Sequence, residues 1–341
     1  MVSPVFPLVK MLLVSSRTRC MNLMENRQAC RSVRSSLSSS NFSTGHQPIA
    51  HITSTKSTTV KNIQALLNRR KARYQQRQVV LEGPRMVIDL YQSRPQLIRT
   101  VVLDETLYPT FAQQLLGDHI PPSIKLVTAS REVLEACTDT VTNQGVLAIC
   151  DMPTVEDNPV TIDSSSSTST VSLILDGVSD PGNFGTLLRS AAACGVVRSV
   201  YCLPHCCDPW NPKALRSAAG ATFAIPHLQS AASWQELRTT QLSSDTILYA
   251  ATMWDDRPSA PYYSATLYPT VSGKNHAGCA IIIGNEGQGL SDDVRLDPDV
   301  QAVHIPMVPG TVESLNAGVC GSILLFEALR QKELLQREGN N

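Results

Sequence analysis

Short apolar runs alternate with glycine-bearing turns and helical stretches along the second half of the chain. Five of these runs have the length and β-branched character of buried strands. They lie at residues 171–175, 197–203, 247–251, 280–283 and 302–305. Because a helical stretch follows most runs, the pattern predicts an α/β domain with a largely parallel, helix-covered sheet.

A last helix is predicted to begin near Glu313. Its apolar residues recur every three or four positions, which predicts one stripe that packs on the sheet. The stripe consists of Leu315, Val319, Ile323, Phe326 and Leu329.

Residues 61–153 mix helical and strand-like runs and predict a smaller α/β domain. Its helices are expected at 61–67 and 83–91, and its strands at 99–103, 124–127 and 145–150. The first third of this domain is basic, with only Glu82 and Asp89 as acids. Such an excess neutralises phosphates, although a solvated helix face has the same composition. The basic residues are Lys61, Arg69, Arg70, Lys71, Arg73, Arg77, Arg85, Arg94 and Arg99.

Composition divides the chain into four parts. Residues 1–58 are rich in arginine and serine and hold one acid, Glu25, which is typical of an organelle transit peptide and also of a disordered basic tail. The small domain is assigned to 59–153, and the Ser/Thr-rich segment 154–170 is an expected linker. The larger domain is assigned to 171–335.

Composition also excludes several classes of protein. No apolar run is long enough to span a bilayer, so no membrane segment is expected. The ten cysteines are expected to be reduced, because no secretory signal is evident. The densest group, Cys202 with His205, Cys206 and Cys207, lacks a second pair at zinc-finger spacing, so no metal is expected.

Three polar segments follow predicted strands, where open α/β sheets bind ligands. In the first, residues 176–195, Asn183 is predicted to cap a helix that carries Arg189. The second, 281–291, holds glycines around Glu286 but lacks the lysine of a phosphate-binding loop and the spacing of a dinucleotide fingerprint, which argues against the rival interpretation as a nucleotide-binding oxidoreductase. Its free backbone groups suit an uncharged ring such as adenine. In the third, 303–323, Thr311 to Ser314 is a predicted cap and Asn316 lies in the first helical turn.

In this order, the three segments resemble the motifs of the SpoU branch of the SPOUT RNA methyltransferases. The first match consists of Asn183, Gly185, Arg189, Ser190, Ala191 and Gly195; the second of Gly284, Glu286, Gly287 and Gly289; and the third of Ile305, Pro306, Met307, Gly310, Ser314, Leu315 and Asn316. Residues 213–221 are similar to the family segment between the first two motifs, and the small domain resembles the family's substrate-binding domain. Ala317 and Gly318 depart from the pattern, since the family often has valine and serine there.

The resemblance implies a fold, a cofactor and partners. The fold would be a trefoil knot formed by the last part of the chain, which departs from the rule that connections do not thread loops. S-adenosylmethionine would be held in the knot by Gly284, Ile305, Met307 and Leu315. The protein would be a homodimer with the target ribose near the interface, and its other partner would be RNA.

The resemblance also implies roles for four catalytic candidates. Arg189 would hold the target phosphate and stabilise charge on the reacting oxygen, while Asn183, Glu286 and Asn316 would orient the ribose, the arginine and the cofactor loops. The expected reaction is 2'-O-methylation of a guanosine in mitochondrial large-subunit ribosomal RNA, in the matrix. A transfer-RNA 2'-O-methyltransferase and a non-catalytic ribosome-assembly factor of the same fold are the alternatives.

Overall fold

The computed structural model describes residues 50–107, 121–138, 143–154, 171–254, 257–269 and 278–338. Most of the predicted leader 1–58 and all but the first residue of the predicted linker 154–170 lie outside these residues. Within them, none of the helices is long and apolar enough to cross a membrane.

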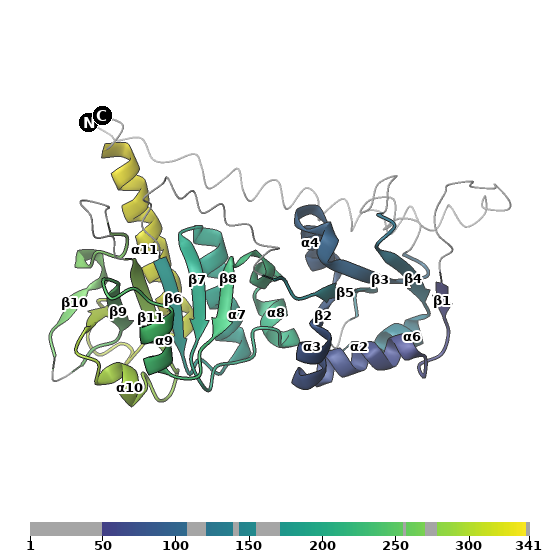
Figure 1. Cartoon of the computed structure of the whole chain (residues 1–341), viewed down its shortest axis with the longest axis horizontal. Coiled ribbons are helices and arrows are strands. Elements are labelled where there is room, and N and C mark those ends of the chain that lie inside the picture. The colour runs from purple at the N-terminus through teal and green to yellow at the C-terminus, as the bar shows by residue number, and fades with distance from the viewer. Residues whose placement is uncertain are drawn as a thin grey trace. The chain divides into compact units, whose positions relative to one another are not determined.

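The small domain is a mixed five-stranded sheet with helices on both faces (Figure 1). The strand order is β1 (Ala50–Ile52), β4 (Lys125–Ala129), β3 (Ile98–Asp104), β5 (Val146–Asp151) and β2 (Gln78–Glu82). β1, β4 and β3 are parallel, whereas β5 is antiparallel to β3 and β2. The helices are α2 (Thr58–Asn68), α3 (Arg70–Gln76), α4 (Pro84–Ser93) and α6 (Arg131–Ala136). The three predicted strands are confirmed, but β1 and β2 were not predicted.

The second domain contains a seven-stranded sheet in which every pair of neighbours is parallel. Its order is β10 (Ser259–Pro261), β12 (Val300–His304), β9 (Ile247–Ala251), β11 (Cys279–Gly284), β6 (Val171–Asp176), β7 (Val197–Cys202) and β8 (His227–Ser230). All five predicted strands are present. The edge strands β8 and β10 were missed because they are short and half-exposed, so they carry no apolar run.

The central strands are buried on both faces, because alternate side chains enter two separate cores. Ile281 and Ile283 of β11 join one core, together with α7 (Pro181–Cys194) and α11 (Ala317–Glu338). Ile282 joins the other, together with α9 (Trp234–Thr240) and α10 (Asp292–Arg295). The prediction that helices cover the sheet of the second domain is therefore confirmed.

The prediction for the last helix was wrong in two respects. α11 begins at Ala317 rather than near Glu313. It buries Leu324, Leu325 and Ala328, whereas Val319 and Phe326 of the predicted stripe are each 47% exposed. The reason is close helix packing: a Cβ on Gly321 would overlap the side chain of Leu187 in α7. The glycine face therefore turns inward and leaves large apolar residues outside.

β11 and β12 lie on opposite sides of β9. The loops that follow β11 and β12 therefore meet across the carboxyl end of β9, and these loops hold the second and third polar segments. The trefoil knot implied by the resemblance stays a prediction, because strand order does not determine how a chain threads.

Gly185 of α7 lies against α8 (Pro212–Ser217), and a Cβ there would be 2.5 Å from the Ala214 carbonyl oxygen and 2.7 Å from the Ala218 nitrogen. Since backbone atoms cannot yield as a side chain can, Gly185→Ala is expected to destabilise the fold by about 1–3 kcal/mol. Thermal unfolding measures the loss. Gly287→Ala is the control, since its Cβ would meet only the Asn285 side chain at 3.7 Å. Equal stability of the two variants would contradict this packing.

Candidate active site

Three polar side chains from the three predicted segments form one hydrogen-bonded chain. The Asn316 Nδ2 donates to Asn183 Oδ1 over 2.8 Å, and the Asn183 Nδ2 donates to Glu286 Oε1 over 2.9 Å. The Asn316 Oδ1 accepts from the Val319 nitrogen at 3.2 Å and so caps α11. Because each amide has its donor and acceptor engaged, the orientation of both amides is fixed.

Asn183 is not the cap of its helix, contrary to prediction. Asp180 is the N-cap of α7, and its Oδ1 accepts from the Asn183 nitrogen at 2.8 Å. Pro181 occupies the first helical turn, where a missing N–H has no consequence. The arrangement frees the Asn183 side chain to face the other two segments.

Asn285 was not singled out from the sequence, although it organises the loop that carries Glu286. Its Oδ1 accepts from the nitrogens of Gly287 and Gln288, both at 2.9 Å, and its Nδ2 donates to the Gly177 carbonyl at 2.7 Å. Its backbone pairs with Gly289 in both directions, at 2.7 and 3.0 Å. The loop after β11 is thus closed on itself and tied to the loop after β6.

The backbone of Gly289 approaches Gly284 so closely that only glycine fits at position 284. A Cβ at this position would lie 2.7 Å from the carbonyl carbon and oxygen of Gly289, so a larger residue would open the loop. The buried Asp176 carboxylate holds the far end of the loop by accepting from the Ser291 nitrogen at 2.6 Å. Burial raises the pKa of Asp176 above its ordinary value, and the Ser291 hydrogen bonds partly offset that rise.

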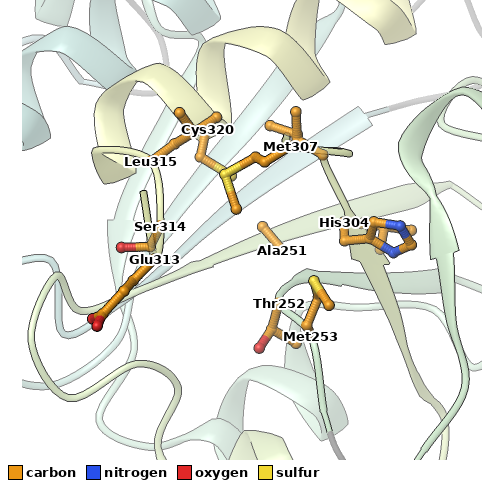
Figure 2. A pocket seen from close by; sticks show the side chains of 11 residues that line it. Ala251, Thr252, Met253, His304, Met307, Glu313, Ser314, Leu315 and Cys320 are labelled. Atoms are coloured by element: carbon orange, nitrogen blue, oxygen red, sulfur yellow. The ribbon is translucent and has the colours of Figure 1, made fainter. Parts of the chain in front are cut away.

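Two adjoining cavities lie beside this network. One has a volume of 320 Å³ and the other 410 Å³, and both are lined by Ala251, Thr252, Ser314, Leu315 and Cys320. Of the predicted cofactor residues, Ile305 and Met307 line the first, Gly284 the second and Leu315 both. Figure 2 shows Met307, Leu315 and Cys320 on one side of the first cavity and Thr252 and Met253 on the other.

The cavity walls combine apolar side chains with backbone groups. Partial burial raises the pKa of Cys320 to about 11, so this thiol is neutral at physiological pH. The contribution of Ala251, Thr252 and Met253 was not predicted, and the position of β9 between β11 and β12 explains it. A planar group with hydrogen-bonding edges suits such a surface better than a phosphate does.

Arg189 lies apart from the other catalytic candidates. It is exposed on α7, and it forms no hydrogen bond or ion pair with any residue that the structure describes. It is not among the described residues that line the two cavities. The structure of one chain therefore brings together Asn183, Glu286 and Asn316 but not Arg189.

The cysteine-rich segment after β7 makes structural contacts. The Cys206 Sγ donates to the Leu175 carbonyl at 3.1 Å, and burial raises the pKa of this thiol to about 12. In the described parts of the chain, no group of three or more His, Cys, Asp or Glu residues is placed to hold a metal ion.

Both domains match known families. Residues 170–326 match the SpoU rRNA Methylase family, and residues 57–148 match the MRM3-like substrate binding domain. The two matches correspond to the seven-stranded and five-stranded sheets, respectively.

Several proteins resemble the chain over most of its length. An uncharacterized tRNA/rRNA methyltransferase of Synechocystis is 33% identical, over 83% of this chain and 95% of the relative. The mitochondrial rRNA methyltransferase 3A of Danio rerio is 32% identical, over 80% of this chain and 68% of the relative. A 23S rRNA guanosine 2'-O-methyltransferase of Bacillus subtilis is 28% identical, over 76% of this chain and 92% of the relative.

A solved structure has the same fold. The AdoMet-bound rRNA methyltransferase from Sinorhizobium meliloti covers 83% of this chain and 98% of its own length, with a TM-score of 0.64 and 24% identity. The three polar segments come together at one site, and both the family match and the relatives agree with that arrangement. The chain therefore belongs to the SpoU rRNA methylase family and is an RNA methyltransferase.

Proposed function

We propose that the protein transfers a methyl group from S-adenosylmethionine to the ribose 2'-hydroxyl of a guanosine in mitochondrial large-subunit ribosomal RNA, in the matrix. The Danio rerio relative is named as mitochondrial, and the Bacillus subtilis relative is named for a guanosine of 23S rRNA. The arginine-rich, serine-rich composition of residues 1–58 supports the location.

The observation that carries this proposal is the chain of hydrogen bonds from Asn316 through Asn183 to Glu286 beside the two cavities. A ribosome-assembly factor without catalysis would not require three polar side chains to be fixed against one another at a cavity. The same arrangement would also serve a transfer-RNA substrate, so the choice of ribosomal RNA rests on the relatives.

The cavities fit S-adenosylmethionine by the chemistry of their walls. Leu315, Ile305 and Met307 provide apolar contacts for the adenine, and the backbone around Gly284 provides hydrogen-bonding groups. The Glu313 carboxylate lines the first cavity and suits a cationic group. When bound, the cofactor supplies an electrophilic methyl on its sulfonium.

The protein side chains position the acceptor. A ribose hydroxyl is a very weak acid, so it has to be held in line and its developing negative charge stabilised. Glu286 and Asn183 are fixed by each other and can orient the ribose. Arg189 is unpaired among the described residues and exposed, so its guanidinium is free to grip a phosphate of the RNA with two parallel hydrogen bonds.

A second copy of the chain is the proposed protein partner. The exposed Val319 and Phe326 lie seven residues apart on one face of α11, and exposed apolar stripes of this kind mark interfaces. α11 packs on α7, and Ser190 Oγ and Ser322 Oγ lie 2.7 Å apart between them. The helix that carries Arg189 therefore adjoins the helix that carries the apolar stripe, which supports a target ribose near the dimer interface.

The direct test is methyl transfer from labelled S-adenosylmethionine to large-subunit ribosomal RNA, with mapping of 2'-O-methyl groups. Glu286→Ala removes the acceptor that orients Asn183 and is expected to lower the rate roughly 10-fold or more. Cys206→Ser is the control and should transfer methyl at nearly the normal rate. Methylation of a base instead of a ribose would refute the proposed reaction.

Arg189→Lys keeps the positive charge but loses the planar fork that can hold two oxygens. The change is expected to raise the barrier by ~2 to 4 kcal/mol, which is ~30-fold to ~1000-fold in rate. Affinity for S-adenosylmethionine should barely change, since Arg189 is absent from the described lining of both cavities. Single-turnover kinetics and cofactor titration of the same variant separate the two effects. Near-normal turnover would remove Arg189 from catalysis.

Phe326→Glu places a charge on the exposed face of α11 and is expected to dissociate the dimer. The free energy of unfolding of the single chain should change by only about 0.5 kcal/mol. Sedimentation equilibrium reports the association state. Leu296→Glu is the control, because Leu296 is 72% exposed and lies outside α11. If both variants remain dimers, or if the unchanged protein is a monomer, the proposed interface is wrong.

A further inference from the structure

A buried ion pair joins the two domains. Arg73 of α3 is 4% exposed, and its Nη2 lies 2.5 Å from the Oδ2 of Asp208; the Asp208 side chain is 8% exposed. Arg73 was one of the basic residues expected to face phosphates, but its burial removes it from that set. Burying two charges is expensive, and a well-packed apolar pair would often be at least as stable. Stability alone therefore does not explain this pair.

Asp208 is the centre of a hydrogen-bond network that includes both domains. Its Oδ1 accepts from the Tyr74 hydroxyl at 2.9 Å and from the Trp210 nitrogen at 3.1 Å. Partial burial and the adjacent Asp208 carboxylate raise the pKa of Tyr74 to about 12, so the phenol stays protonated and donates. The Arg73 Nη1 donates to the carbonyls of Leu66 and Leu67 at the end of α2, at 2.9 and 3.2 Å.

Apolar packing continues this contact into α8, which follows the Asp208 loop. Trp210, Leu215 and Phe223 belong to the same buried core as residues of β2 and α4 in the small domain. A second ion pair joins α8 to β2, since the Arg216 Nη1 lies 3.3 Å from the Glu82 Oε2. α8 is thus packed into the small domain although the chain places it in the methyltransferase domain.

The other side of α8 touches the first turn of α7. The Ser217 Oγ donates to the Gly182 carbonyl at 2.7 Å, and Gly185 leaves room for the α8 backbone. Gly182 and Gly185 flank Asn183, whose side chain is bonded to Glu286. A continuous set of contacts therefore runs from Arg73 through Asp208 and α8 to the candidate active site.

We propose that α8 and the Asp208 loop form a rigid link that sets where RNA bound to the small domain meets the methyl-transfer site, and that Arg73 and Asp208 are positioning residues. The inference rests on the proposed function. A small domain attached only through a linker would raise the local concentration of RNA. A docked domain also fixes the direction in which the RNA reaches Asn183 and Glu286, and a shift of about 1 Å in such geometry can lower a rate 100-fold.

The test is Arg73→Lys, which keeps the charge but cannot reach Asp208 and both carbonyls together. Turnover at saturating ribosomal RNA is expected to fall roughly 10-fold to 100-fold. The dissociation constants of RNA and S-adenosylmethionine should stay within about twofold, because the buried Arg73 is available to neither. Asp208→Asn, which retains an acceptor for Tyr74, is the second variant if Arg73→Lys does not fold.

Glu135→Gln is the matched control, since it removes a carboxylate from an exposed ion pair within the small domain, Arg131 to Glu135 at 3.0 Å.

The outcomes separate a positioning role of the Arg73–Asp208 pair from a purely stabilising role and from a role in RNA binding. All assays are run well below the measured unfolding temperature of each variant, so a purely stabilising ion pair would leave turnover normal and would overturn the inference. A loss found only in RNA affinity would overturn it as well. Loss of turnover with both affinities retained, and absent in Glu135→Gln, supports it. The unchanged protein is assayed in parallel: if it transfers no methyl group, the proposed function itself fails, which is a separate result.

Discussion

The parallel pairing of β11 with β6 is the constraint on which the candidate active site depends. The register places Ile283 opposite Leu175 and Gly284 opposite Asp176, so both strands end at the same level. The loops that follow can then bond to each other, through Asn285 to the Gly177 carbonyl and through Asp176 to the Ser291 nitrogen. The hydrogen bond from Asn183 to Glu286 joins the segments that follow these two strands a third time. A register slip of one residue would turn the isoleucines of β11 into the opposite cores and separate the polar groups.

Much of this arrangement could be predicted from the sequence. The five apolar runs of the large sheet are strong signals, and glycine and polar residues after strands mark the loops at the carboxyl edge. The edge strands β8 and β10 gave no signal, because a half-exposed strand has a mixed composition. The direction faced by α11 could not be predicted, since periodicity identifies an apolar face but not its partner. In this helix the face with Gly321 packs inside, and Val319 and Phe326 on another face are left exposed.

Among the site residues, too, some could be predicted from the sequence and others could not. Asn183, Glu286 and Asn316 were predicted as one group, and the structure places them in one hydrogen-bonded chain. Asn285 and Asp176 were missed because their role is to hold backbone groups, which depends on the closed shape of the loop and not on any spacing in the sequence. Arg73 was assigned to a basic surface because a burial state cannot be deduced from a cluster of charges. Whether a charged side chain contacts solvent, a phosphate or a buried carboxylate depends on the tertiary fold, as the partner Asp208 lies far along the chain.

In the proposed reaction, the fixed and the free polar groups have different functions. The amides of Asn183 and Asn316 are bonded within the chain, so they are already oriented before RNA arrives and lose little entropy on binding. Arg189 has no partner among the described residues. A guanidinium that were paired with a carboxylate would have to give up that pair to bind a phosphate, and part of its binding energy would be lost. Arg189 is unpaired in the described part of the chain and exposed on the helix that also carries Asn183, while Asn183 belongs to a preorganised polar chain. The proposed reaction favours this arrangement, because one group has to receive a mobile RNA backbone and the others have to hold the reacting ribose still.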